Sequence, residues 1–165
     1  QDFDLALMSQ LIAFLSGTTQ LGALKKNAQE KVWEQLESRS ATNEILKDKR
    51  GKPIEDEIAS LTELLNRALD PKFPFVDNSL SPLRLSKAQK DDILRLHRFR
   101  NNLAHVRPLS WSVEVVGLPR MALACTYAIQ HLFTHSTQRI HLSDQQVESA
   151  EANLATISQA LQAMN

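Results

Sequence analysis

Apolar residues recur every three or four positions along most of this chain, which is the period of helices that bury one face. In the first half, this period predicts a helix over residues 3–15, a second from about residue 21, and a third that starts near Pro53. The apolar positions of the second helix are Leu21, Leu24, Ala28, Val32 and Leu36, and the pattern allows it to continue, with a bend, to Lys49. Those of the third helix are Ile54, Ile58, Leu61, Leu65 and Leu69.

A capping pattern marks the start of a fourth helix. Ser86 is followed three residues later by Gln89, the spacing of a capping box. The apolar period then continues to about Val106, and Pro108 predicts that the helix stops there because the residue before a proline avoids helical backbone angles.

Two further helices complete the pattern. Residues 120–134 are apolar on most sides, so we expect this fifth helix at the centre of the molecule. Ser143 and Gln146 form another capping-box pattern, which opens an alanine-rich, polar helix that runs to about Met164. Its polarity is typical of a helix on the outer wall of a bundle.

Two stretches break the helical period. Residues 70–85 contain three prolines, and we expect Phe73, Phe75 and Val76 to fill gaps in the core there. Within residues 107–119, the segment WSVEVV (residues 111–116) alternates as a strand does. The fold predicted for residues 1–165 is nevertheless a single all-α domain, a bundle of about five to six helices.

Composition narrows the classes of function. The 165 residues include 19 basic and 19 acidic ones, so the chain as a whole does not attract nucleic acids or membranes. Any anion site must therefore be local. One cysteine excludes an internal disulfide and a cysteine-based zinc cage, and it fits a reducing compartment, so we expect a cytoplasmic protein. No apolar run is long enough for a membrane-spanning helix, so no membrane partner is expected. Because the chain begins with Gln inside a predicted helix, we expect it to be a piece of a longer protein.

The fourth helix contains an arginine within its apolar face. On a wheel of about 100° per residue, Arg100 falls close to the centre of that face. The apolar members of the face are Ile93, Leu96, Phe99, Leu103 and Ala104. A buried guanidinium without a partner is costly, so Arg100 needs an anion or an aqueous cleft.

His105 follows at the end of the same helix. It lies about 140° around the wheel from Arg100, so the two side chains converge only if the helix ends or unwinds near Ala104. An arginine fork binds phosphate, and a histidine titrates near neutral pH and moves protons. The pair therefore indicates cleavage of a phosphodiester without a metal or cofactor, with the 2′-hydroxyl of RNA as the nucleophile.

The segment RNNLAH (residues 100–105) resembles the R-x4–6-H signature of the HEPN superfamily, and the predicted helical context is similar to that of the family. Together with the residues that follow, it most resembles the Swt1-like and abortive-infection branches. The resemblance implies a metal-independent endoribonuclease that forms a homodimer with two motifs facing one cleft. Arg100, Asn101 and His105 would be its catalytic residues, and Arg98, Asn102 and Arg107 are candidate RNA contacts.

Several alternatives stay open at this stage. The intact motif favours an active enzyme, but the resemblance also allows a non-catalytic HEPN module that dimerises, binds RNA or recruits another domain. An antitoxin or a fused domain is a candidate partner. Arg100 could instead form a structural ion pair with a carboxylate of another helix, such as Glu57 or Glu63. His97, on the apolar flank of the same helix, is interpreted as a packed histidine with satisfied hydrogen bonds.

Other residues are interpreted as structural. His131 and His135 have metal-compatible spacing on one helix, but His141 is the sole candidate for a third ligand, so no metal site is predicted. Cys125 lies in the most apolar helix and is expected in the core. Trp111 is more typical of a loop anchor than of a surface that stacks on bases.

Overall fold

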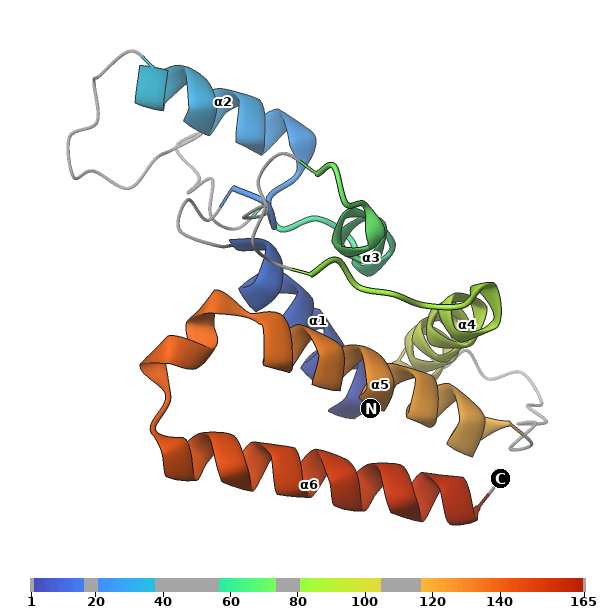
Figure 1. Cartoon of the computed structure of the whole chain (residues 1–165). Coiled ribbons are helices and arrows are strands. Elements are labelled where there is room, and N and C mark those ends of the chain that lie inside the picture. Colours follow the sequence, from blue (N-terminus) through green and yellow to red (C-terminus); the bar gives the residue numbers. More distant parts are fainter. Residues whose placement is uncertain (1, 17–20, 38–56, 74–80, 105–116, 165) are drawn as a thin grey trace.

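The structure, a computed structural model, describes residues 2–16, 21–37, 57–73, 81–104 and 117–164. The regular elements in these ranges are all helical: α1 (Asp2–Ser16), α2 (Lys26–Glu37), α3 (Leu61–Leu69), α4 (Lys87–Ala104), α5 (Leu118–His135), the 3-10 helix η2 (Thr137–His141) and α6 (Asp144–Ala163). The predicted all-α bundle is confirmed (Figure 1). The strand-like residues 111–116 lie outside the described ranges.

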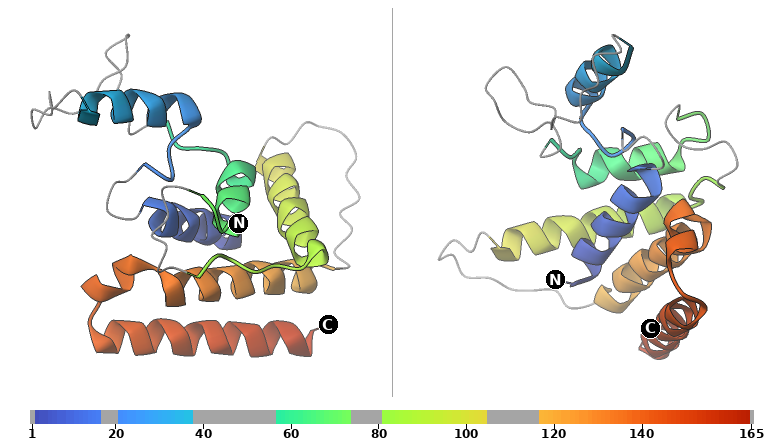
Figure 2. Two further views of the ribbon diagram at one scale, coloured as in Figure 1. Left: turned by 45° about the horizontal axis from the view of Figure 1, so that its top comes forward. Right: turned by 90° about the vertical axis from the view of Figure 1, so that its left-hand side faces the viewer.

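Helix α5 lies in the middle of the bundle, as its apolar sequence predicts. It contacts α1, α4 and α6, and its buried side chains lie along most of its length. Helix α6 runs antiparallel to α5 on one side, while α1 and α4 lie on the other (Figure 2). This arrangement makes α5 the common support of the elements on both sides.

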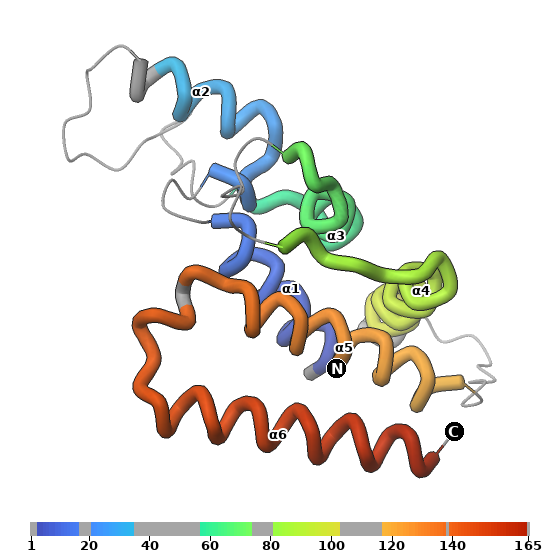
Figure 3. The backbone as a smooth tube through the Cα atoms, in the orientation of Figure 1, coloured from blue at the N-terminus to red at the C-terminus, as the bar shows by residue number. Residues whose placement is uncertain are grey.

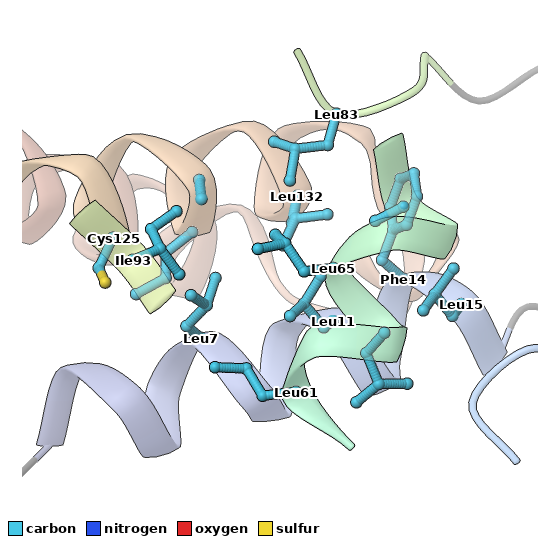
Figure 4. Packing of buried hydrophobic residues seen from close by; sticks show 14 of the residues in the cluster. Leu7, Leu11, Phe14, Leu15, Leu61, Leu65, Leu83, Ile93, Cys125 and Leu132 are labelled. Carbon is cyan, nitrogen blue, oxygen red and sulfur yellow. The ribbon is translucent and has the colours of Figure 1, made fainter. Parts of the chain in front are cut away.

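The main core lies where α1, α3 and α5 meet. Leu7, Leu11, Phe14 and Leu15 of α1 are at most 1% exposed. Figure 4 shows them facing side chains from the other helices and from the segment before α4: Leu61, Leu65, Leu83, Ile93, Cys125 and Leu132. Burial of a leucine-sized side chain stabilises a fold by roughly 1.5–3 kcal/mol, so this cluster fixes how α4 and α1 lie relative to each other.

The predicted start of the second helix is wrong. Residues 21–25 form a turn, and α2 begins at Lys26 (Figure 3). The Ala59 N–H donates to the Ala23 carbonyl at 2.9 Å, next to an isolated antiparallel bridge between Leu24 and Ile58. Backbone groups that pair across the chain in this way do not form helical hydrogen bonds. The predicted continuation toward Lys49 lies outside the described residues.

The predicted start of the third helix is also wrong. Residues 57–60 are extended, and α3 begins at Leu61. The Ser60 Oγ accepts a hydrogen bond from the Glu63 N–H at 3.3 Å, so Ser60 caps the helix at a point that the apolar period alone does not mark. Ile58 packs in the core from an extended segment instead of a helix.

Both predicted capping boxes are present. At the start of α4, the Gln89 N–H donates to Ser86 Oγ at 3.2 Å, and the Ser86 N–H donates to Gln89 Oε1 at 2.9 Å. Ser143 and Gln146 make the same reciprocal pair before α6. None of the α6 residues is fully buried, in agreement with its predicted place on the outer wall.

The first irregular stretch is non-helical where it is described, at residues 70–73 and 81–85, and Phe73 packs against the core from there. Phe75 and Val76 lie outside the described residues. In the described ranges, every helix is too short or too polar to cross a membrane.

Candidate functional site

The candidate site lies where the C-terminal part of α4 meets the first turn of α1. The Ser86 cap sets where α4 begins, and the buried Ile93 belongs to the core that packs α4 against α5. Leu94 and Leu96 are partly buried beside this core. The N-terminal end of α1 lies beside the far end of α4 in Figure 2 (right). Residues 4 and 97–101 are therefore close in space despite their separation along the chain.

A second contact orients α4 against the start of α5. Asp92 of α4 accepts two hydrogen bonds from Arg120, one from Nε and one from Nη2, each at 2.9 Å. This planar fork fixes the direction of the pair more strictly than a single contact would. The bond to the Asp92 carboxylate raises the pKa of Arg120 above its ordinary value.

Arg100 lies on the face of α4 that packs against the bundle, two turns after the buried Ile93, as the wheel predicts, but it is not fully buried. Its side chain is 31% exposed, and its Nε atom is buried. The nearest anion is the Asp4 carboxylate, whose Oδ2 lies 3.9 Å from that Nε. This distance allows electrostatic attraction but is too long for a hydrogen bond, and Nε has no hydrogen-bond partner among the described residues. The guanidinium is thus attracted to Asp4 without being bound tightly by it.

Asp4, His97, Asn101 and Arg100 form a closed network. Asp4 Oδ1 lies 2.8 Å from His97 Nδ1, and His97 Nε2 lies 3.1 Å from Asn101 Nδ2. The Arg100 Nη1 donates to Asn101 Oδ1 at 3.0 Å, and the Arg100–Asp4 ion pair completes the ring. Asp4 is almost fully buried, so the network connects the interior between α1 and α4 to the partly exposed guanidinium.

The predicted catalytic residues can be placed only in part. Arg100 and Asn101 are brought together by their hydrogen bond, which agrees with a role for Asn101 in orienting the arginine. The predicted third catalytic residue, His105, lies outside the described residues, as does the candidate RNA contact Arg107. The helical assignment reaches Ala104, so the predicted convergence of Arg100 with His105 stays a prediction.

The other two candidate RNA contacts lie on the surface. Arg98 and Asn102 are both exposed, on a side of α4 that also carries the exposed Arg95. The Arg98 Nε donates to the Leu94 carbonyl of the same helix at 3.3 Å. These side chains do not join the Asp4 network.

The sequence did not predict that Asp4 belongs to the site or that His97 connects Asp4 to Asn101. It anticipated a carboxylate partner for Arg100 but named Glu57 or Glu63. In the structure Glu63 pairs with Arg67, and Glu57 accepts a hydrogen bond from Asn27. The available signals were an acidic residue at the start of α1 and the four-residue spacing from His97 to Asn101, which places both on one helix face. The interpretation of His97 as a satisfied histidine is confirmed, since both its ring nitrogens have partners.

The remaining candidate residues are less suited to metal binding or nucleophilic catalysis. The rings of His131 and His135 are 4.5 Å apart, and burial together with His131 lowers the pKa of His135. Within the described residues, no three His, Cys, Asp or Glu side chains are grouped as metal ligands. Burial, assisted by the nearby Asp4 and Asp92 charges, raises the pKa of Cys125 to about 12, so this thiol is a poor nucleophile. Trp111 lies outside the described residues.

Comparisons of this chain with protein-family models, with curated proteins and with solved structures find no match.

Proposed function

We propose that this chain is a metal-independent endoribonuclease of the HEPN type that acts as a homodimer in the cytoplasm. The observation that carries the proposal is the placement of Arg100 within the RNNLAH motif. Its guanidinium is partly exposed, is oriented by Asn101, and is not bound tightly by Asp4. An arginine whose donors remain accessible is able to bind a phosphate as a fork.

The charge of α4 supports an RNA substrate. Its 18 residues include five Lys or Arg and two Asp, a formal net charge of +3 in a chain whose total is zero. One of the two Asp residues, Asp92, is already paired with Arg120. The exposed Arg95 and Arg98 lie on the side of α4 away from Arg100, about 140–160° around the helix. Together with Arg100 they give α4 its positive charge, which favours contact with a phosphate backbone.

The proposed reaction follows from the two motif side chains. Arg100 binds the scissile phosphate, and the neighbouring 2′-hydroxyl oxygen attacks the phosphorus. A bond forms between O2′ and phosphorus while the bond to O5′ breaks. His105 takes part in moving the proton from the 2′-hydroxyl or to the leaving 5′-oxygen. The products are a 2′,3′-cyclic phosphate and a 5′-hydroxyl end, so DNA is not a substrate.

A direct test is RNA cleavage in EDTA by wild-type protein and by His105→Ala and Arg100→Lys variants. His105→Ala should lose roughly 10²–10⁴-fold in rate, the usual range for loss of a general acid or base. Arg100→Lys should also lose most activity because an ammonium lacks the planar fork. Arg139→Lys is the matched control, since Arg139 pairs with Glu151 of α6, away from the network.

Melting temperatures recorded for the same proteins separate chemistry from folding. Loss of activity in folded variants supports the proposal. Loss of activity only in proportion to unfolding would make Arg100 a structural ion-pair partner of Asp4 instead.

The second candidate is a non-catalytic HEPN module that pairs protomers, binds RNA or recruits a fused domain. The zero net charge of the chain favours this alternative because it weakens general attraction to RNA. A dimer that binds RNA but never cleaves it would identify this function. A toxin or defence effector controlled by an antitoxin is the setting that we propose for the active enzyme.

A further inference from the structure

The hydrogen-bond chemistry of the Asp4 network fixes the direction of each of its bonds. A guanidinium only donates, so the atom of Asn101 that faces Arg100 must be the amide oxygen. The amide nitrogen of Asn101 then faces His97, and it also donates. His97 Nε2 must therefore accept, which leaves the ring proton on Nδ1, where it is donated to Asp4.

We propose that His97 is a positioning residue for Arg100, acting as a neutral imidazole that holds the Asn101 amide with its oxygen toward the guanidinium. The inference rests on the proposed function for its catalytic consequence. Asp4 sets the tautomer of His97, His97 sets the orientation of Asn101, and Asn101 aligns the Arg100 fork. In this arrangement the buried contacts between α1 and α4 determine the orientation of the partly exposed Arg100 side chain.

The same contacts argue against His97 as the proton-transfer residue itself. Both ring nitrogens are engaged, one with Asp4 and one with Asn101, and the side chain is only 24% exposed. A general base needs a free lone pair within reach of the proton that it removes. His97 therefore acts through Asn101 and Arg100.

A second ring proton, on His97 Nε2, would disrupt this chain of hydrogen bonds. A proton on Nε2 would face the donating amide nitrogen of Asn101, and the amide could relieve the conflict only by turning over. Its nitrogen would then face Arg100, donor against donor, and the hydrogen bond to Asn101 Oδ1 would be lost. Among the described residues, the charged groups of this network are Asp4 from α1, which contacts His97, and Arg100, which pairs with Asp4; Cys125 of α5, near Asp4, stays neutral.

The tautomer can be measured without any assay of activity. Nitrogen-15 NMR of the histidine side chains in the wild-type chain, assigned with a His97→Gln variant, should show the His97 proton on Nδ1 and a bare Nε2 at neutral pH. A proton on Nε2 would overturn the inference, even if the protein cleaves RNA as proposed.

Three substitutions test the catalytic consequence. His97→Phe fills a similar volume without hydrogen bonds and should lower kcat/KM by roughly 10- to 100-fold, as expected when a catalytic group is misaligned. His97→Gln keeps one donor and one acceptor and should recover most of that loss. Asn101→Asp places an acceptor toward Arg100 but cannot donate to His97, and it should behave as His97→Phe does. Equal activity in wild type and His97→Phe would refute the positioning role.

Binding of an uncleavable substrate gives a second readout. The probe is an RNA oligonucleotide with a 2′-O-methyl group at the cleavage site, and all proteins carry His105→Ala so that the probe stays intact. Affinity should be weaker when residue 97 is Phe than when it is His or Gln. Equal Kd values for the three proteins would contradict the positioning role.

The two proposals fail in different ways. If wild-type protein binds the probe and keeps the Nδ1 tautomer but cleaves no RNA, the endoribonuclease proposal falls and the positioning of a phosphate-binding Arg100 remains. If it cleaves RNA and His97→Phe has no effect, the reverse holds.

Discussion

Arg67 and Arg100 both reach toward the interior of the described part of the chain, and their contacts differ in a way that indicates what each one does. Arg67 is 8% exposed and donates to the Gly22 carbonyl at 2.8 Å, to the Leu24 carbonyl and to Glu63. Its guanidinium also lies over the Phe73 ring, 5.3 Å from the centroid. Arg100 Nε is buried and has no hydrogen-bond partner within the described residues, and the side chain is more exposed than that of Arg67. The first contact pattern is that of a structural residue, and the second leaves part of the Arg100 side chain exposed to a ligand.

This contrast predicts opposite results for alanine substitutions. Arg67→Ala should lower the free energy of unfolding by about 2–4 kcal/mol because it leaves two backbone carbonyls without a donor. Arg100→Ala should change it by less than about 1 kcal/mol, since Asp4 keeps its bond to His97 and the lost ion pair is partly exposed. Urea denaturation of both variants measures the difference. A large loss for Arg100→Ala would favour a structural ion pair.

The sequence pattern identified Arg100 and Asn101 as site residues, but it did not identify Asp4 as the partner of Arg100 or His97 as the partner of Asn101. A wheel shows which residues share a face of one helix, and so it gives the proximity of Arg100 to the apolar face of α4. It contains no information on which residue of another helix lies opposite. Asp4 is 96 positions before Arg100 in the sequence, and its place depends on how α1 and α4 both pack on α5. Only the assembled core determines that partner.

Helix α6 depends on its first turn more than the other described helices do. It has no fully buried residue, and it packs mainly against α5. An N-cap normally contributes about 1 kcal/mol, so Ser143→Ala should remove a large share of what holds the start of this helix. We expect a loss of about 1 kcal/mol in the free energy of unfolding and faster amide hydrogen exchange in the first turn of α6. Unchanged exchange there would show that packing on α5 suffices.

The end of α5 should respond to acid. Burial and the nearby His131 lower the pKa of His135 below its ordinary 6.5, so the unfolded chain binds this proton more readily than the folded one. The contribution of His135 to the free energy of unfolding is fully present above about pH 6.5. It is lost as the pH falls through the lowered pKa, and at still lower pH it no longer changes.

Melting temperatures of wild type and His135→Gln, compared between pH 7.5 and 5, measure this effect. The wild type should lose more stability than the variant over that interval. An equal loss in both proteins would mean that His135 makes no contribution to acid sensitivity.

The start of a helix could be predicted from the sequence where side chains within a few residues of it determine that start. The capping boxes at Ser86 and Ser143 rest on side chains three residues away, and both helices begin where these predict. The segments 21–25 and 57–60 could not be predicted in this way, because their backbones pair with each other across more than thirty residues. Residues 21–25 also lie close to α1, since a Cβ on Gly22 would lie 2.0 Å from the Leu15 carbonyl oxygen. An apolar period does not distinguish such a paired segment from a helix.

At the scale of the whole molecule, charge is separated between two helices on opposite sides of α5. Helix α4 has a formal net charge of +3, while α6 has three acidic residues and no basic ones. A net charge of zero therefore hides two helices of opposite charge. Because the positive helix carries Arg100, any contact of RNA with the proposed site should weaken as the salt concentration rises.

A symmetric homodimer with α4 near the two-fold axis would bring two copies of this positively charged helix to one cleft. The geometry of one helix gives a reason for that assembly. Arg100 and His105 lie about 140° apart on a regular helix, so they do not converge within one copy while α4 stays helical to its end. An isologous contact lets Arg100 of one protomer meet His105 of its partner.

Mixed dimers test this arrangement. Arg100→Ala and His105→Ala proteins with different affinity tags can be co-expressed, and the heterodimer can be purified through both tags. If the working pair is formed between protomers, one intact pair remains in the heterodimer, and it should cleave RNA at a substantial fraction of the wild-type rate while both parent homodimers are inactive. If the pair is formed within one chain, each chain of the heterodimer lacks one member and cleavage is absent. The inactive heterodimer would mean that the backbone departs from a regular helix before His105, so that one copy of the motif is a complete site.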